Sequence, residues 1–323
     1  MGKRRTLEKI DQPIRILVTG GFGYVGGRVA QHLVEKGYQV VLGSRKIQSS
    51  PDWLPQSEVV QLRWDDEAAL AEICNSVNVV IHTAGMNAQD CAFDPVAALE
   101  FNGLATARLM RASINEGITK FIYLSTAHVY RSPLVGEIDE KTCPRNLHPY
   151  ASSHLAGENA VLYGSITQDD FTGIVLRLSN AIGMPVHKDV NCWMLVSNDL
   201  CRQAVTNRKI ILNSSGQQKR DFVPMSYVSK VVINIINTDE SKIYNVGSGF
   251  SLSIIAIAKL IINRYSKLFG YNVELVFSDN QRDFMSQDLI YGSIFDEKLK
   301  NDLMSDIELE IDNILKLCAE LYE

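Results

Sequence analysis

The amino-acid sequence predicts an α/β fold, in which a doubly wound parallel β-sheet is covered by helices and followed by a smaller C-terminal α/β lobe. Short apolar, β-branched runs alternate with helix-length segments over residues 14–183, as is typical of parallel sheets. Three glycines separate the first such run from the segment after it, where a strand must turn into a helix. With 323 residues, 46% of them hydrophobic, the chain is long enough for a large domain with a smaller companion.

The first strand, helix and second strand are expected at residues 14–18, 25–34 and 39–42. The two strands are short apolar runs rich in β-branched residues, whereas the segment between them has helical periodicity and ends before Gly37. This order predicts a β-α-β unit.

Gly20, Gly23 and Gly26 form a G-x-x-G-x-x-G pattern between the first strand and the helix. Glycine permits the turn and lets backbone N–H groups approach a pyrophosphate, which the helix N-terminus stabilises. Three glycines alone are a weak signal. Placed after a first strand and at the start of a helix, they indicate a dinucleotide site.

The end of the second strand bears on the choice of dinucleotide. An acidic residue there would favour NAD, because it accepts a hydrogen bond from the 2′-hydroxyl. This chain has Gly43, Ser44, Arg45 and Lys46 instead. A guanidinium beside a hydroxyl suits a 2′-phosphate, so we expect NADP(H) as the preferred cofactor. NAD(H) is the alternative if Arg45 and Lys46 form only a solvated loop.

Three later strands are expected at residues 78–85, 120–130 and 173–183, with helices between them. The closing acidic segment, residues 306–323, is amphipathic and is expected to pack on the C-terminal lobe. Ligands of parallel sheets lie across the carboxyl ends of the strands. The small or polar residues at those ends are Gly85, Ser125, Thr126 and Asn180.

The charge balance does not favour a nucleic-acid or membrane-surface protein, since 32 basic residues face 37 acidic ones for a net charge of −5. Residues 1–13 include a short basic run and are expected to form a flexible arm. The longest apolar runs are interrupted before about twenty residues, so no membrane span is expected.

The six cysteines are scattered without a C-x-x-C pair, and no signal peptide precedes them, which leads us to expect reduced thiols and a cytoplasmic protein. The six histidines form no ligand cluster with each other or with cysteine, so no metal site is expected. His82 lies in an expected buried strand and is interpreted as a core residue.

Seven motifs resemble, in order and spacing, the extended short-chain dehydrogenase/reductases, and among them the nucleotide-sugar epimerase/dehydratase group. They are TGGFGYVG, VVIHTAG, YLSTAHVY, PYASSH, LRLSNAIG, RDFVPMSYV and YNVGSG. The resemblance implies a Rossmann dinucleotide-binding domain over residues 14–183 and a mainly substrate-binding lobe over residues 184–323, from which strands can return to the main sheet. It also implies a homodimer formed through residues 95–110 and 150–164.

The resemblance further implies that Thr126, Tyr150 and His154 form the catalytic set, with Tyr150 as the acid/base. The family has Y-x-x-x-K where this chain has Tyr150 and His154, and a lysine charge would lower the pKa of the phenol. In one reading, His154 hydrogen-bonds the cofactor and becomes charged as Tyr150 ionises, which gives a working site. In the other, the site is impaired and the protein only binds nucleotide. We favour the first, because Thr126, Tyr150 and the glycines are retained.

The ligand-binding residues also follow from the resemblance. Arg220 and Arg282 are expected to clamp the diphosphate of a nucleoside-diphosphate sugar, because a guanidinium can donate two parallel hydrogen bonds. Arg220 could instead pair with Asp221 or with a neighbour on a surface strand. The full substrate set is Thr126, Asn180, Arg220 and Arg282. The expected cofactor-binding residues are Gly20, Phe22, Gly23, Tyr24, Val25, Gly26, Ser44, Arg45, Trp64, Asp65, Ala84, Gly85, Ser125, Tyr150 and His154.

Dehydratases of this group carry Asp-Glu after the threonine, where this chain has Ala127 and His128, so a 4,6-dehydratase is not expected. Reduction of a keto-sugar and epimerisation at C4 remain, and the expected NADP(H) site favours reduction. One alternative is a catalytically impaired, cofactor-binding regulatory protein of the same fold. Another is a reductase of a non-sugar carbonyl, against which Arg220 and Arg282 argue.

Overall fold

The computed structural model describes residues 13–278, 287–295 and 302–322, so residues 1–12 of the expected arm lie outside the described residues. Its chain divides into two compact units. The chain crosses from one unit to the other close to the expected boundary, at residues 178 and 179, and also at several other points. Of the described residues, unit 1 holds those up to residue 132, 143–178 and 231–244, and unit 2 holds 133–142, 179–230 and those from residue 245 onwards.

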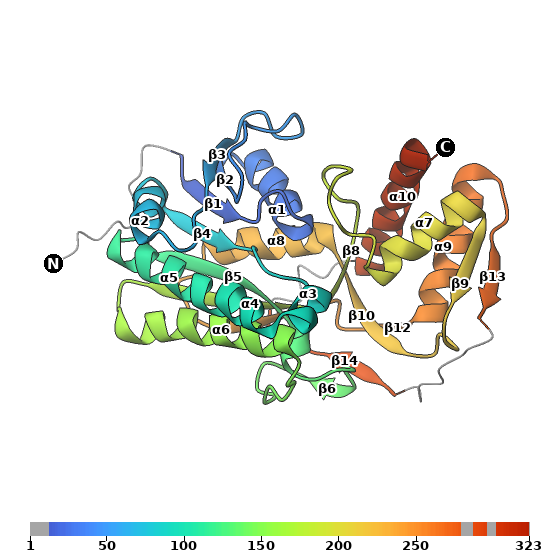
Figure 1. Ribbon diagram of the computed structural model, residues 1–323. Helices are drawn as coiled ribbons and strands as arrows, with labels where there is room; N and C mark the ends of the chain where they lie inside the picture. The colour runs from blue at the N-terminus through green and yellow to red at the C-terminus, as the bar shows by residue number, and fades with distance from the viewer. Residues whose placement is uncertain (1–12, 279–286, 296–301, 323) are drawn as a thin grey trace. The chain divides into compact units, whose positions relative to one another are not determined.

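A seven-stranded sheet in the order β11-β7-β5-β4-β1-β2-β3 forms the centre of unit 1 (Figure 1). All pairings from β7 to β3 are parallel. This confirms the predicted α/β fold, and it brings the carboxyl ends of the strands to one edge of the sheet. The strands are β1 (Arg15–Thr19), β2 (Gln39–Ser44), β3 (Glu58–Gln61), β4 (Val79–His82), β5 (Lys120–Thr126), β7 (Thr172–Leu178) and β11 (Ile243–Val246).

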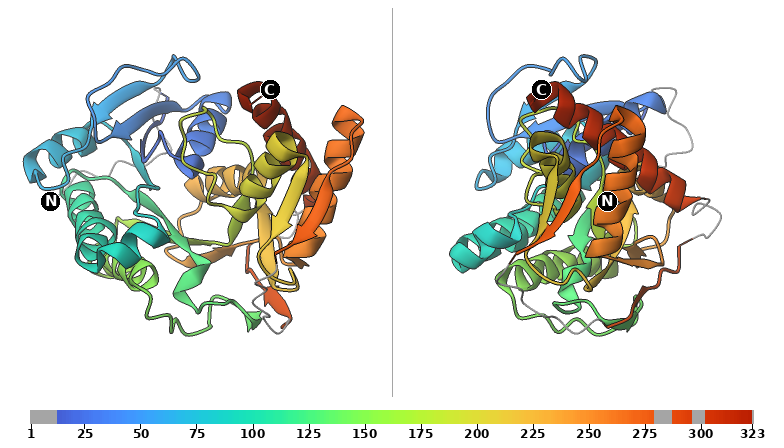
Figure 2. Two further views of the ribbon diagram at one scale, coloured as in Figure 1. Left: turned by 45° about the vertical axis from the view of Figure 1, so that its right-hand side comes forward. Right: turned by 90° about the vertical axis from the view of Figure 1, so that its right-hand side faces the viewer.

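The inner strands β4 and β5 are buried along their whole length, as expected of parallel strands whose two faces are both covered. Helices α2, α5 and α6 pack side by side along the sheet (Figures 1 and 2). The helical segments that belong to unit 1 or reach into it are α1 (Tyr24–Glu35), α2 (Glu67–Asn75), α3 (Ala88–Phe93), α4 (Pro95–Ala98), the π-helix η2 (Leu99–Ala105), α5 (Thr106–Asn115), the 3₁₀-helix η3 (Ala127–Val129), α6 (Pro149–Thr167) and α8 (Met225–Ile236).

Unit 2 has its own apolar core, to which α7, α9 and α10 contribute Leu200, Ile257, Ile261, Ile311 and Ile314. The closing acidic segment therefore packs within this lobe as predicted. Its sheets are β12-β10-β8, β13-β9 and β14-β6. The elements are β6 (Gly136–Ile138), β8 (Asn180–Ile182), α7 (Val196–Asn207), β9 (Lys209–Leu212), β10 (Lys219–Pro224), β12 (Ser251–Ser253), α9 (Ile254–Phe269), β13 (Glu274–Phe277), β14 (Leu289–Tyr291) and α10 (Leu303–Tyr322).

The single strand predicted over residues 173–183 is wrong, because the structure breaks it at Ser179. β7 ends at Leu178 in the main sheet, and β8 begins at Asn180, where it pairs with β10 of unit 2. The Ser179 hydroxyl donates a hydrogen bond of 2.6 Å to the buried carboxylate of Asp221, which anchors the break. Asn180 thus begins a strand of unit 2 and does not end a strand of the main sheet.

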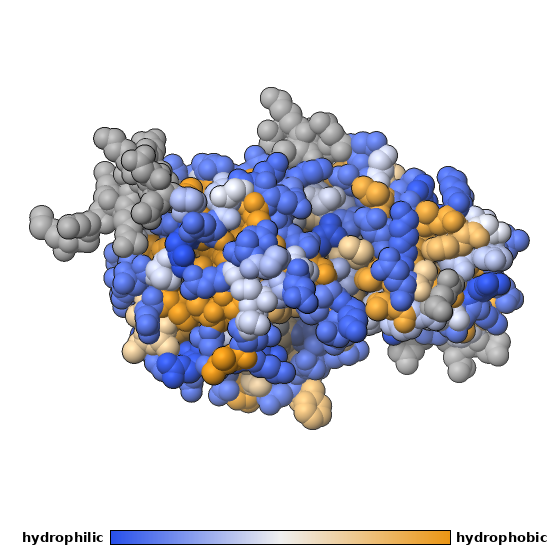
Figure 3. All heavy atoms as spheres, turned by 90° about the horizontal axis from the view of Figure 1, so that it is seen from above, coloured by the Kyte–Doolittle hydropathy of each residue, from blue (hydrophilic) through white to orange (hydrophobic). Residues whose placement is uncertain are grey.

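Hydrophilic side chains cover most of the face drawn in Figure 3, and hydrophobic ones lie in smaller areas among them. Of the helices in the described part of the chain, none is both long enough and apolar enough to cross a membrane.

Candidate active site

The glycine-rich turn after β1 lies against the loop that follows β4. Gly20 has a φ of +65°, and a side-chain carbon there would lie 2.9 Å from the backbone of Ala84. A side-chain carbon at Gly26 would lie 2.3 Å from the carbonyl oxygen of Gly20 and 2.5 Å from the hydroxyl of Thr83. Larger residues would therefore push the turn and the loop apart.

The N-terminus of α1 has the composition of an anion site. Its N-cap is Gly23, which has no side chain to cap the helix, and its first turn carries no acidic residue. The first N–H groups of a helix have no partner within the helix and attract anions. Together with the close glycine turn, this end of α1 fits the pyrophosphate of a dinucleotide. Phe22 lies in the same turn, and Tyr24 and Val25 are the first two residues of α1.

Ser44 ends β2 and accepts hydrogen bonds from the Lys46 N–H at 3.1 Å and from the Gln48 side chain at 2.7 Å. Arg45 is exposed directly after it. The hydroxyl thus organises the turn that presents the guanidinium. The expected role of Arg45 toward a 2′-phosphate stays a prediction.

Trp64, which was expected beside the adenine, packs against two aromatic side chains of unit 1. Its ring lies 5.4 Å from that of Phe101 and 5.7 Å from that of His82 between centroids. Its indole N–H is buried without a hydrogen-bond partner, whereas Asp65 is exposed. The expected adenine contacts of these two residues stay predictions.

Thr126 and Tyr150 are brought together at the carboxyl end of β5. Thr126 is the last residue of β5 and accepts the N–H of His128 at 3.1 Å. Tyr150 lies in the first turn of α6, which begins at Pro149, a residue well suited to that position. Burial raises the pKa of the Tyr150 phenol above its ordinary value, and the hydrogen bond from Thr126 opposes that shift.

His154 lies one turn further along α6 and is buried. Its Nδ1 atom is 2.8 Å from the hydroxyl of Tyr123, and its ring meets that of Tyr150 edge to face. Burial lowers the pKa of His154 to about 4, so the imidazole is neutral at pH 7. The reading in which His154 becomes charged as Tyr150 ionises stays a prediction, and burial of the ring opposes it.

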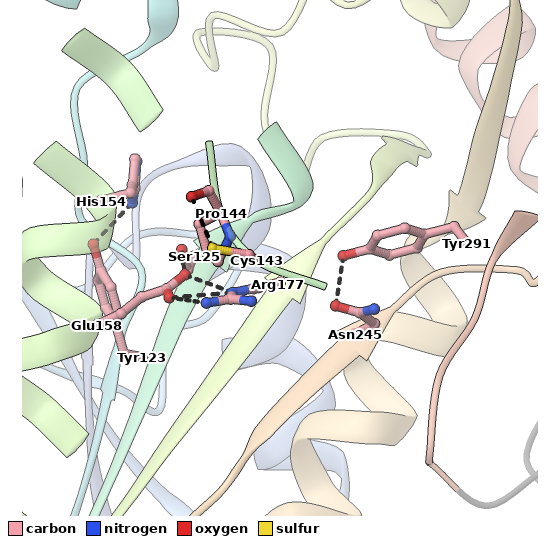
Figure 4. Close-up of polar contacts among 9 residues, drawn as sticks. All are labelled: Tyr123, Ser125, Cys143, Pro144, His154, Glu158, Arg177, Asn245 and Tyr291. Carbon is pink, nitrogen blue, oxygen red and sulfur yellow. Dashed lines mark hydrogen bonds and ion pairs between the residues drawn. The ribbon is translucent and has the colours of Figure 1, made fainter. Parts of the chain in front are cut away.

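The Ser125 hydroxyl donates a hydrogen bond of 2.5 Å to Glu158, which is buried on α6. The expected contact of Ser125 with the cofactor stays a prediction. Arg177 of β7 is also buried and binds both carboxylate oxygens of Glu158, at 2.6 to 3.1 Å. The Arg177 guanidinium lies 4.7 Å from the ring centre of Tyr130. Figure 4 shows Ser125 and Arg177 converging on Glu158, and Tyr123 pointing at His154.

Sequence reasoning missed two contributors to this site, Glu158 and Tyr123. Glu158 could have been found, because it follows Tyr150 and His154 at a spacing of four residues along one face of the helix. Tyr123 is 31 residues from His154, and nothing in the local pattern joins them. The interpretation of His82 as a core residue is confirmed, since it is buried between the hydroxyls of Thr19 and Thr106.

The expected substrate residues Asn180 and Arg220 belong to unit 2. The Asn180 amide donates to the carbonyl oxygen of Asp221 at 3.0 Å, and the Arg220 guanidinium donates to Gln218 at 3.3 Å. The Asp221 carboxylate is instead bound by Ser179, Ser248 and Gly249. Arg282 lies outside the described residues.

The fold and the glycine turn define a protein of the Rossmann dinucleotide-binding class. The family model of the NAD dependent epimerase/dehydratase family matches residues 16–247, and the chain belongs to this family.

Individual relatives carry different activities. The chain is 29% identical over 263 residues to dTDP-D-glucose 4,6-dehydratase of Mus musculus, covering 77% of this chain and 72% of the relative. It is 28% identical over 244 residues to a putative UDP-glucose 4-epimerase of Methanocaldococcus jannaschii, covering 74% and 78%. The structure of UDP-glucose 4-epimerase from Thermotoga maritima with UDP-glucose is similar in fold. It has a TM-score of 0.79 at 20% identity, over 96% of this chain and 100% of the other.

Proposed function

We propose that this chain catalyses an NAD(P)-dependent oxidoreduction of a nucleoside-diphosphate sugar, as a keto-sugar reductase or a C4 epimerase. The observation that carries this proposal is the place of Tyr150 in the first turn of α6 and of Thr126 at the carboxyl end of β5, where Thr126 lowers the pKa of the Tyr150 phenol against the effect of burial, in a chain of an NAD-dependent family. A phenol in that place can exchange a proton with a sugar hydroxyl while hydride moves at the same carbon.

The protein's part of the reaction follows from these side chains. Bound NAD(P) supplies hydride transfer. Tyr150 takes the proton from the sugar hydroxyl during oxidation and returns it to the carbonyl oxygen during reduction. Thr126 stabilises the ionised phenol by hydrogen bonding, which opposes the effect of burial on its pKa. His154 contributes no charge at neutral pH, because its pKa is lowered to about 4.

The family includes 4,6-dehydratases, one of them at 29% identity. Our proposal excludes that reaction for this chain, because it needs an acid and a base beside the threonine. The positions after Thr126 hold Ala127, which has no acid/base group, and His128, not the Asp-Glu pair that the family resemblance implies for a dehydratase.

The choice between reduction and epimerisation rests on two features that point in different directions. An exposed Arg45 after Ser44 favours NADPH, the usual reductant, and hence reduction. The epimerase relative at 28% identity favours epimerisation. We place reduction of a keto-sugar first, because Arg45 is a feature of this chain itself.

The substrate and the assembly are part of the same proposal. Asn180, Arg220 and Arg282 would hold the sugar diphosphate, as a diphosphate suits paired guanidinium donors. A homodimer would form through the helices that leave Val96, Leu99, Tyr163 and Ile166 exposed. Apolar side chains exposed on neighbouring helices are typical of an interface.

The test begins with the nucleotide released from the purified protein on denaturation. NADPH oxidation is then followed with a panel of keto-sugar nucleotides, and C4 epimerisation is followed with UDP-glucose and UDP-galactose. Turnover in either assay that vanishes in Tyr150→Phe supports the proposal. Binding of NAD(P) with no turnover of any sugar nucleotide would favour the regulatory protein instead. Turnover of a simple ketone alone would favour a reductase of a non-sugar carbonyl.

A further inference from the structure

The imidazole of His154 has one ring nitrogen bound inside unit 1. The hydroxyl of Tyr123, on β5, lies 2.8 Å from His154 Nδ1, and both side chains are buried (Figure 4). A neutral imidazole has one N–H and one unprotonated nitrogen. The direction of this hydrogen bond therefore decides which nitrogen of His154 carries the proton.

His82, on β4, holds the ring of Tyr123 in place. The two rings are stacked, with their centroids 5.4 Å apart and their planes 22° apart. Both ring nitrogens of His82 are engaged, Nδ1 at 2.6 Å from the Thr19 hydroxyl and Nε2 at 2.9 Å from the Thr106 hydroxyl. Burial lowers the pKa of His82 to about 3, so this imidazole is neutral as well.

The hydrogens of this network can be assigned from Thr19 onwards. Its hydroxyl oxygen accepts the N–H groups of Thr83 and Ala84 at 3.2 and 3.3 Å, so its own hydrogen is directed to Nδ1 of His82. His82 therefore carries its proton on Nε2. It donates that proton to the hydroxyl oxygen of Thr106.

The Tyr123 hydroxyl lies 2.8 Å from His154 Nδ1, and Thr106 is another polar side chain, one that lowers the pKa of its phenol. Thr106 gives its own hydrogen to the carbonyl oxygen of Asn102 at 2.7 Å and already receives that of His82. An imidazole nitrogen is a far stronger base than a hydroxyl oxygen. The phenol hydrogen of Tyr123 is therefore directed to His154, which leaves the His154 proton on Nε2.

The Nε2 edge of His154 faces the loop that follows β4. A side-chain carbon at Gly85 would lie 3.4 Å from Cε1 and 3.6 Å from Nε2 of this ring. Gly85 stands at the carboxyl end of the sheet, where a dinucleotide binds in this class of fold. An N–H at Nε2 thus faces the loop at the carboxyl end of the sheet.

We propose that Tyr123 is a positioning residue that locks His154 as its neutral Nε2–H tautomer, and so presents a hydrogen-bond donor to the bound dinucleotide. This inference rests on the proposed function, because it assigns a donor at the same cofactor site. Tyr123 acts only through His154. His154 then donates a hydrogen bond at the position where the family that this chain resembles has a lysine. Unlike that lysine, it carries no positive charge.

The first test measures the parent protein and uses one variant only to identify signals. Long-range ¹H–¹⁵N correlation spectra of histidine-labelled protein at pH 7.5 distinguish protonated from unprotonated ring nitrogens, and the His154 signals are identified by their loss in His154→Gln. We expect Nε2 of His154 to be protonated and Nδ1 to be unprotonated. Protonated Nδ1 would overturn the proposal, because the hydrogen bond would then run from His154 to Tyr123.

The second test removes the Tyr123 hydroxyl. In Tyr123→Phe we expect His154 to show a mixture of tautomers and the affinity for NADP⁺ or NAD⁺ to fall about threefold to tenfold, the effect of one hydrogen bond. Tyr265→Phe is the matched control, because its phenol hydroxyl is buried in unit 2 without a hydrogen-bond partner. Unchanged His154 signals in a folded Tyr123→Phe protein would overturn the proposal.

These measurements separate this inference from the proposed function. The tautomer and the affinity for NADP⁺ or NAD⁺ are both measured without turnover, so absence of activity toward sugar nucleotides would leave the role of Tyr123 standing. Conversely, turnover of a sugar nucleotide by a protein whose His154 is protonated on Nδ1 would support the proposed function and reject the role of Tyr123.

Discussion

The rings of Tyr150 and His154 meet edge to face with their centroids 4.6 Å apart, but their polar atoms have different partners. Thr126 lowers the pKa of the Tyr150 phenol, whereas His154 Nδ1 is hydrogen-bonded to Tyr123. The two residues are therefore neighbours on one helix face whose polar atoms interact with different side chains. Acid/base chemistry at this site is expected to run through Tyr150 and Thr126, with His154 as a neutral neighbour.

Replacing His154 by lysine should change the pH dependence of turnover. A fixed positive charge beside the phenol lowers the pKa of Tyr150, so the rise of kcat for sugar oxidation should move to lower pH. His154→Gln, which adds no charge, is the control and should leave the position of the rise unchanged. An identical profile in a folded His154→Lys protein that binds cofactor would show that position 154 does not influence Tyr150.

The two buried histidines should make the protein less stable in mild acid. Their pKa values in the folded protein are lowered to about 3 for His82 and about 4 for His154, whereas the unfolded chain takes up protons near pH 6.5. Their contribution to stability is therefore complete above about pH 6.5 and is lost as the pH falls toward the folded values. At pH 5 the loss is about 2 kcal/mol for each histidine.

Urea unfolding at pH 7.5 and pH 5 measures this loss. The titratable side chains that face His154 are Tyr150 and Glu158 on α6, Tyr123 on β5, and His82 on β4. His154→Gln removes one of the two histidines and should reduce the difference between the two pH values by about half. A difference that does not change in this variant would mean that His154 is not buried as a neutral group.

The ion pair between Glu158 and Arg177 should be costly to break from one side. Both side chains are at most 3% exposed, so Glu158→Gln leaves a buried guanidinium without its counter-charge, at a cost of about 3 to 5 kcal/mol. Glu58→Gln is the matched control, because Glu58 pairs with Arg15 at the surface and should cost about 1 kcal/mol or less. Equal losses in denaturant unfolding would contradict this account.

Arg45 should determine the choice of cofactor. If its guanidinium meets a 2′-phosphate, Arg45→Ala weakens the binding of NADPH by about 1.5 to 3 kcal/mol and leaves the binding of NADH nearly unchanged. Arg63→Ala is the control, since Arg63 is paired with Asp66. Titration of both cofactors into each variant measures the difference. Equal losses for NADPH and NADH, or tighter NADH binding in the parent protein, would remove the basis for an NADP preference.

The parts of the fold that follow from local patterns could be predicted. The first strand, helix and strand were recognisable because apolar periodicity and the glycines act over a few residues. The break at Ser179 was not, because it depends on the carboxylate of Asp221, 42 residues away. The return of residues 231–244 to unit 1 is also a long-range feature, and only the family resemblance, not a local pattern, allowed for it.

Some features of the candidate site could likewise be predicted from local patterns, and others could not. Thr126 and Tyr150 could be named from motifs, and the structure places them together. The neutral state of His154 could not be anticipated, because it depends on burial in the folded chain, and Tyr123 comes from a different strand. The orientation of Ser125 was missed as well, since its partner Glu158 lies on α6.

The central claim is that Tyr150 drives NAD(P)-dependent redox chemistry on a nucleoside-diphosphate sugar. The most direct measurement mixes the protein with NADPH and a keto-sugar nucleotide, or with oxidised cofactor and UDP-glucose or UDP-galactose. It follows the near-ultraviolet absorbance of the reduced nicotinamide and the sugar products. The account predicts turnover by the parent protein and a loss of at least about a hundredfold in Tyr150→Phe, with cofactor affinity retained. Turnover that persists undiminished in Tyr150→Phe would contradict it.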